Sequence, residues 1–140
     1  MSTLVWGVKA SLLDYVRGMS DGAVAVDGAI ESADGFTFPS AAGPDDGILR
    51  FRGSVTLTGH SGMMRVVIAD PWVAVDSREL SIADPDDPTG RLTFARFVAL
   101  ASDGEQMLRA QGTTLTADGS DLFFGPYREG TTLDDPVVTA

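Results

Sequence analysis

The 140-residue sequence has no cysteine and a single histidine, and each shortage excludes a class of site. Without cysteine there is no disulfide framework, no thiolate nucleophile, no iron–sulfur cluster and no cysteine-ligated zinc or haem. With His60 as the only histidine, a metal site built from several imidazoles is excluded. A Ser-His-Asp triad would need that same residue, and no Gly-x-Ser-x-Gly motif supplies its serine.

Basic residues are also scarce, with ten against twenty acidic ones and a net charge of −10. An acidic chain repels phosphates, so we expect no nucleic-acid partner. Many acids fall in turn-like pairs such as Asp45-Asp46, which is typical of a solubilising surface. No apolar run approaches the about 20 residues of a membrane span, so we expect no membrane insertion.

The length predicts one domain over residues 1–140, because it falls within the ordinary range for a single domain. A periodic apolar pattern starts at Leu4, directly after Met-Ser-Thr, which leaves no room for a secretory signal. As the chain stands we therefore expect a cytoplasmic protein. The cell envelope or secretion is expected instead if the chain was trimmed from a longer precursor.

Short alternating segments separated by Gly and Asp turns dominate the pattern. The sequence therefore predicts a mainly β, single-domain fold, a sandwich or flattened barrel of many short antiparallel strands with one or two short helices. We expect one long strand from Leu92 to Leu100. The other expected strands centre on residues 4–8, 24–26, 36–38, 49–57, 64–68, 72–75, 107–108, 113–116 and 122–124.

One segment, from Ser11 to Met19, has helical spacing of its apolar residues. Ser11 followed three residues later by Asp14 fits the start of a helix, with the serine as its cap. Gly18 is placed to end the helix. Tyr15 lies on the apolar stripe of this helix.

Few residues are left that can support chemistry. Aspartates are plentiful, but nearly all lie in Asp-Gly or Asp-Pro turns, which disfavours a carboxylate-pair hydrolase. The Asp84–Asp87 turn lacks the glycine and terminal glutamate of an EF-hand. Tyr15 and His60 stand out, although the pattern alone favours a core aromatic with one hydrogen bond for Tyr15 and an exposed turn residue for His60.

Four segments resemble, in order, the HtaA domain, the haem-binding module of actinobacterial haem-uptake proteins. The opening Trp6–Val16 (WGVKASLLDYV) and the middle Phe51–Met64 (FRGSVTLTGHSGMM) match most specifically. Phe36–Pro39 (FTFP) and the closing Tyr127–Val137 (YREGTTLDDPV) match in kind. The resemblance runs from about Leu4 to the C-terminus, and it departs at Leu57, where an aromatic residue is common.

The resemblance implies a mostly β fold that binds ferric haem (ferric protoporphyrin IX) through a tyrosine. Carried over by position, Tyr15 would be the axial iron ligand, His60 its hydrogen-bonded partner and Ser11 a third polar pocket residue. Whether Ser11 caps the helix or faces the haem is open. The apolar walls of the pocket could come from Phe36, Phe38, Met63 and Met64, which suit the core equally well, and Arg17 is the predicted propionate partner.

Phenolate is a hard anionic donor that suits Fe³⁺, and reduction or acid weakens the bond. That chemistry favours a carrier for haem transport, transfer or storage over an enzyme. Its expected partners are haem and another haem carrier or transporter. The alternative is a β-sandwich protein- or glycan-interaction domain that has lost haem binding, and a haem-degrading or peroxidatic enzyme ranks third.

Overall fold

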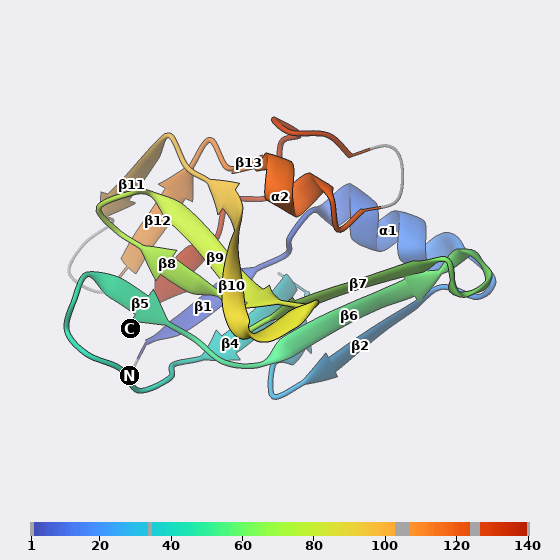
Figure 1. Ribbon diagram of the computed structural model, residues 1–140, viewed down its shortest axis with the longest axis horizontal. Helices are drawn as coiled ribbons and strands as arrows, with labels where there is room; N and C mark the ends of the chain where they lie inside the picture. Colours follow the sequence, from blue (N-terminus) through green and yellow to red (C-terminus); the bar gives the residue numbers. More distant parts are fainter. Residues whose placement is uncertain (1, 34, 103–106, 124–126, 140) are drawn as a thin grey trace.

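The computed structural model describes residues 2–33, 35–102, 107–123 and 127–139. In these ranges the chain forms three antiparallel sheets and two short helices around a shared core (Figure 1). The prediction of a mainly β fold with one or two short helices is confirmed. The sheets do not close on one another, so the architecture is a sandwich and not a barrel.

The three sheets are built from short strands. The largest contains β1 (Thr3–Trp6), β3 (Ile30–Ser32), β4 (Gly35–Pro39), β11 (Ala99–Ser102), β12 (Met107–Gln111) and β14 (Val137–Thr139), in the order β11-β12-β14-β1-β4-β3. The second contains β5 (Ile48–Arg50), β8 (Trp72–Ala74), β9 (Glu79–Asp84), β10 (Asp87–Arg96) and β13 (Thr114–Leu115), in the order β13-β10-β9-β8-β5. The third contains β2 (Ala23–Asp27), β6 (Ser54–Gly59) and β7 (Met64–Ala69), in the order β2-β6-β7. A single 3-10 turn, η1 (His60–Gly62), joins β6 to β7, and the helices are α1 (Ala10–Gly18) and α2 (Ala117–Ser120).

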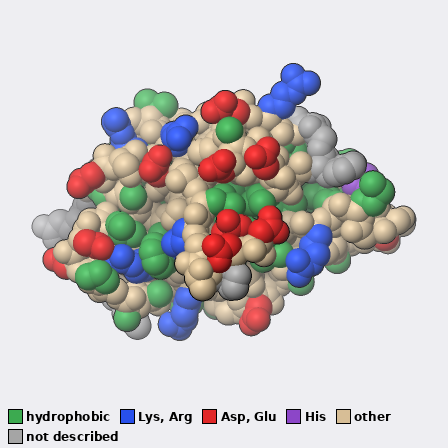
Figure 2. All heavy atoms as spheres, viewed as in Figure 1, with side chains coloured by type: hydrophobic (Ala, Val, Ile, Leu, Met, Phe, Trp, Pro, Cys, Tyr) green, Lys and Arg blue, Asp and Glu red, His purple; other side chains and the backbone are tan. Residues whose placement is uncertain are grey.

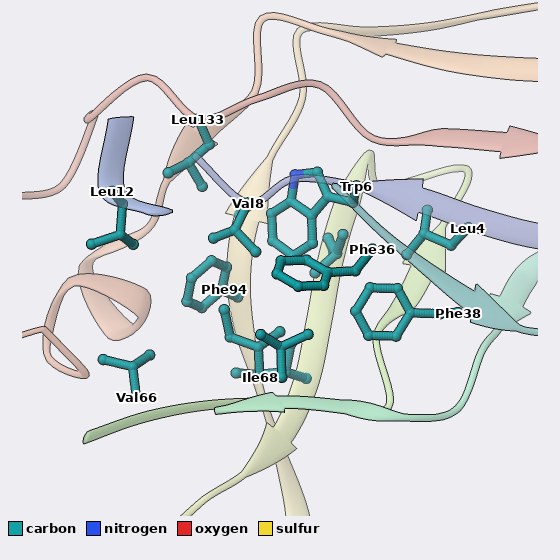
Figure 3. Close-up of a cluster of buried hydrophobic side chains, with 14 of the residues drawn as sticks. Leu4, Trp6, Val8, Leu12, Phe36, Phe38, Val66, Ile68, Phe94 and Leu133 are labelled. Atoms are coloured by element: carbon teal, nitrogen blue, oxygen red, sulfur yellow. The ribbon is translucent and has the colours of Figure 1, made fainter. Parts of the chain in front are cut away.

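The core lies between the six-stranded sheet and the other two sheets. Leu4 and Trp6 on β1 pair directly with Phe38 and Phe36 on β4, and all four side chains are buried. The Trp6 ring meets Phe94 of β10 edge to face, with centroids 5.8 Å apart (Figure 3). Alternate residues of a strand point to the same face, so the alternation in the sequence correctly predicts these inward positions.

Three predicted strands are wrong. The segment 49–57 is divided between β5 and β6, which belong to different sheets. The run from Leu92 to Leu100 is divided between β10 and β11, which belong to different sheets. The chain changes sheets at Phe97 and Val98, whose N–H groups donate to Arg78 and Gln111. Residues 122–123 form a turn after α2 because Leu122 and Phe123 continue its hydrogen bonds to Gly119 and Ser120, and the predicted position 124 lies outside the described residues.

Helix α1 buries one face against the sheets and exposes the other. Leu12, Leu13 and Val16 are buried, whereas Tyr15 is 51% exposed. The helix ends at Gly18 as predicted, although it starts one residue earlier than expected. In the described part of the chain, no helix combines the length and the apolar character needed to cross a membrane.

The expected capping role of Ser11 is wrong. The N-cap position belongs to Lys9, whose side chain makes no capping bond, and Ser11 lies inside the first turn with an exposed side chain. The N–H of Ala10 instead donates to Asp134 Oδ2 at 3.1 Å. Because that carboxylate is 124 positions away in the sequence, local spacing cannot reveal it.

Asp134 makes three contacts that together form what we term the Asp134 clamp. Besides capping α1, its N–H donates to the Val8 carbonyl at 2.9 Å, and its own carbonyl accepts the Trp6 Nε1–H at 2.7 Å. Val8, between β1 and α1, has φ of 59°. Left-handed backbone is strained for a β-branched residue, so the clamp holds an unfavourable junction in place.

We predict that Asp134→Ala lowers the free energy of unfolding by about 1–2 kcal/mol, the usual effect of losing a helix cap. Asp134→Asn keeps an acceptor oxygen and is expected to cost less. Urea unfolding followed by circular dichroism measures both. The control is Asp45→Ala in an exposed loop, expected within about 0.5 kcal/mol of wild type; an equal loss in Asp45→Ala and Asp134→Ala would contradict the capping role.

Candidate functional site

Tyr15 and His60, the two residues singled out from the sequence, form a hydrogen-bonded pair. The Tyr15 hydroxyl lies 2.7 Å from His60 Nε2, and the ring centroids are 5.6 Å apart with the planes inclined at 45°. The exposure of Tyr15 is not that of a core aromatic, which removes that alternative for this residue. His60 is exposed in a turn, as the simpler reading of it predicted, but its imidazole has a specific partner.

The pair is assembled from two elements that meet at one end of the molecule. Tyr15 lies on α1, and the last pair of the β6–β7 ladder, Gly59 with Met64, leaves His60 at the tip of the hairpin. Figure 1 shows the far end of α1 beside this tip. A Cβ built on Gly59 would lie 2.4 Å from Met19 Cε, so glycine there allows the Met19 side chain to pack against the hairpin.

Apolar surface adjoins the pair on the β7 side. Met63, beside His60 in the loop, is 64% exposed, whereas Met64 is buried. Both line a groove of about 120 Å³ whose far wall includes Leu122 and Phe123. Figure 2 shows the histidine at one end of the molecule with hydrophobic side chains near it. The predicted pocket residues Met63 and Met64 therefore lie on the hairpin that carries His60.

A second tyrosine lies close to the pair and was given no role in the sequence analysis. Tyr127 is half-buried against the core, with its ring centroid 5.1 Å from that of Phe123. Burial raises the pKa of Tyr127, and the nearby phenol of Tyr15 raises it further. The only signal for Tyr127 in the sequence was its place in the closing segment that resembles the HtaA domain.

Asp21 was recognised only as part of an Asp-Gly turn, yet it contacts the site. Its carboxylate Oδ2 accepts the N–H of Ser61, the residue after His60, at 2.6 Å. The sequence pattern predicts a turn at this position but cannot show which backbone group the carboxylate binds.

Other predicted pocket residues are not brought to the pair. Phe36 and Phe38 are fully buried, and Figure 3 places Phe38 beside Leu4, at the end of the core away from Leu12. Arg17, predicted to pair with a haem propionate, forms an ion pair with Glu31 instead. Ser11 is exposed on the same helix as Tyr15, one turn before it.

A larger hollow in the described part of the surface lies elsewhere. It has a volume of about 420 Å³ and is lined by residues of β1, β12 and β14 together with Asp134 and Asp135. None of the site residues predicted from the sequence lines it. We place the candidate site at the Tyr15–His60 pair, because the chemistry of the side chains, rather than the size of a hollow, distinguishes it.

Comparison with solved structures places the fold. The C-terminal domain of HtaA from Corynebacterium glutamicum matches with a TM-score of 0.74 and 26% identity over 99% of this chain and 94% of that chain. A histidine-to-alanine variant of that domain, a domain-swapped dimer, matches with a TM-score of 0.61 and 25% identity over 96% and 94%. The heme binding protein HtaB from the same organism matches with a TM-score of 0.71 and 21% identity over 99% and 92%.

Comparison at the level of sequence gives the family. No curated protein sequence matches the chain. The profile of the HtaA family (Htaa) matches residues 1–139, which is almost the entire chain. By this match, the protein belongs to the HtaA family.

Proposed function

We propose that this protein binds ferric haem at the Tyr15–His60 pair and carries or stores it without catalytic turnover. In this proposal the Tyr15 oxygen is the iron ligand and His60 is its hydrogen-bonded partner. The observation that carries the proposal is that the hydroxyl of the half-exposed Tyr15 lies 2.7 Å from the only imidazole in the chain. Membership of the HtaA family and the fold shared with the heme binding protein HtaB support it.

The donor set of the pair fits ferric haem. A bound haem supplies Fe³⁺, a hard cation that favours an anionic oxygen ligand. The Tyr15 hydroxyl must lose its proton to become that ligand. His60 Nε2 is within hydrogen-bonding distance of the oxygen, so it can hold the ring in one orientation and adjust the basicity of the oxygen.

Of the two tyrosines at this end of the molecule, Tyr15 is the better ligand. Burial raises the pKa of Tyr127, which makes its phenolate harder to form. Tyr127 also packs against Phe123, whereas Tyr15 is 51% exposed. Tyr127 is therefore better suited to form part of the wall beside the ligand.

The surface around Tyr15 can hold one face or edge of a porphyrin. The groove beside Met63 and Met64 is smaller than the about 300–1,000 Å³ of most enclosed ligand pockets. Apolar contact there would come from Met63 and Phe123, and the hydroxyl of Ser11 lies on the face of α1 that carries Tyr15. We infer that the haem stays partly open to solvent.

A carrier function fits this arrangement better than catalysis. Peroxide chemistry on haem needs an acid–base group free to move a proton, and the only imidazole is engaged with Tyr15. A partly open haem held by one phenolate is accessible to a second carrier or a transporter, which would take it when the ligand is protonated or the iron reduced.

Tyr15→Phe is expected to weaken hemin binding by about 100-fold, or ~2.7 kcal/mol, because the iron loses its anionic oxygen ligand. In a hemin titration of the apoprotein, wild type should give a saturable one-to-one complex with the charge-transfer absorption of ferric tyrosinate. The variant should lose that absorption. Because the Tyr15 side chain is half-exposed, the Tyr15→Phe protein should unfold thermally at the same temperature as wild type.

Tyr127→Phe is the matched variant, since it removes the same hydroxyl from the neighbouring ring. It is expected to keep the charge-transfer absorption. If Tyr127→Phe loses the charge-transfer absorption and Tyr15→Phe keeps it, the iron ligand is Tyr127 and not Tyr15. A spectrum of free hemin in wild type would instead favour an interaction domain that has lost haem binding.

A pH titration of the apoprotein tests the surroundings of Tyr127. Since burial and Tyr15 both raise the pKa of Tyr127, its phenol should ionise above the ordinary value of about 10. In Tyr15→Phe the single remaining step should move toward lower pH, yet stay above that value, because burial is the larger cause. Absorbance near 295 nm follows the ionisation of Tyr127 in wild type and in Tyr15→Phe, and an unshifted Tyr127 in both proteins would contradict this placement.

A further inference from the structure

The loop that carries His60 has an unfavourable backbone. His60 and Ser61 have φ of 51° and 56°, and Gly62 follows with φ of 86°. The left-handed region is costly for residues that have a Cβ, and two of these three do. The loop therefore needs contacts from outside to stay in this conformation.

Few contacts of that kind are available to the loop. Within the loop, the Met63 N–H donates to the His60 carbonyl at 3.0 Å. From outside, among the described residues, Tyr15 meets the imidazole and Asp21 accepts the Ser61 N–H at 2.6 Å. Asp21 is the side chain that binds the backbone of the loop, through a charge-assisted hydrogen bond, which is stronger than a neutral one.

Asp21 is itself held close to the helix that carries Tyr15. After α1 the chain turns through hydrogen bonds from Met19 N–H to Val16 and from Gly22 N–H to Met19. A Cβ on Gly22 would lie 1.8 Å from the Val16 carbonyl oxygen, so this turn packs against the helix backbone with no room for a side chain. The backbone of Asp21 is therefore held in a fixed position at the end of α1.

We propose that Asp21 is a positioning residue that keeps the imidazole of His60 against the Tyr15 oxygen. Helix α1 and the turn after it contact the hairpin tip at two adjacent points. Tyr15 hydrogen-bonds the imidazole of His60, and Asp21 accepts the N–H of Ser61. Without the second point, the strained loop relaxes and His60 leaves its place. The consequence for haem rests on the function proposed above, whereas the positioning is a property of the apoprotein.

A spectroscopic test reads the position of His60 directly. Because His60 is the only histidine, its ring nitrogens are assigned without ambiguity in long-range ¹H–¹⁵N correlation spectra of the apoprotein at fixed pH. In an otherwise wild-type chain, Tyr15→Phe should shift the Nε2 resonance, since the hydrogen bond is lost. In an Asp21→Ala background, the same substitution should no longer shift it.

Three further variants separate positioning from general damage. Asp21→Asn keeps an acceptor oxygen and should retain the Tyr15-dependent shift. Ser61→Gly removes the cost of the left-handed backbone, so it should restore that shift in the Asp21→Ala chain. Asp27→Ala, which removes an exposed carboxylate on the neighbouring strand β2, should behave as wild type.

The effect on haem is measured by transfer of hemin from each variant to an excess of apomyoglobin. Asp21→Ala should release hemin about tenfold faster, as expected for loss of a group that orients a ligand's partner. Asp21→Asn and the double variant Asp21→Ala/Ser61→Gly should release it at close to the wild-type rate.

The two proposals fail differently. If Tyr15→Phe still shifts the Nε2 resonance in the Asp21→Ala background, or if Ser61→Gly does not restore the shift, the positioning role is wrong whatever hemin does. If wild type does not bind hemin but the resonance behaves as expected, the haem proposal fails and the positioning role stands. Should Asp21→Ala not fold, comparison of Asp21→Asn with wild type decides, because a lost shift in that variant would contradict the role of the acceptor oxygen.

Discussion

The direction of the helix that carries Tyr15 depends on contact between the two ends of the chain. The first strand, β1, lies between β4 and the last strand, β14, and the Thr3 and Thr139 hydroxyls meet at 2.6 Å. Just before β14, the Asp134 clamp binds β1, the strained Val8 and the first turn of α1. Since an α-helix is stiff, fixing its start in this way also fixes where Tyr15 emerges.

The Tyr15–His60 bond is of a different kind, because the fold does not need it. It lies at the surface, where one hydrogen bond contributes only about 0.5–1.5 kcal/mol of net stability. The fold is held by the aromatic and aliphatic side chains of the core, part of which is drawn in Figure 3, and neither Tyr15 nor His60 belongs to it. An exposed phenol that is oriented but not required for stability is free to exchange its proton for a bound cation, and this is the property on which the proposed function depends.

Features set by residues close together in the sequence could be predicted from it, whereas features set by residues far apart in the sequence could not. Alternation along β1 and β4 gave the correct inward residues, because the side-chain direction of a strand is a local property. The pairing of Tyr15 with His60 came from family resemblance, and the geometry is compatible with it. Of the two roles left open for Ser11, the helix cap is wrong, since the first turn of α1 is capped by Asp134, which tertiary structure supplies.

Other errors have the same origin. The apolar run through Phe97 reads as one strand, but where a chain leaves one sheet for another is decided by partners such as Arg78 and Gln111. Residue type alone suited Phe38 equally to a pocket wall or to the core, and its burial beside Leu4 depends on the sheet register. Asp21 and Tyr127 were missed because their roles exist only once separate elements meet.

The position of the chain ends relative to the site has a practical consequence. Both termini lie at one end of the molecule, whereas the hairpin tip and the end of α1 lie at the other (Figure 1). A surface, a tag or another domain joined through either terminus would therefore leave Tyr15 facing outward, unobstructed by the attachment. Such an attachment would leave the proposed haem site on the side of the molecule opposite its anchor.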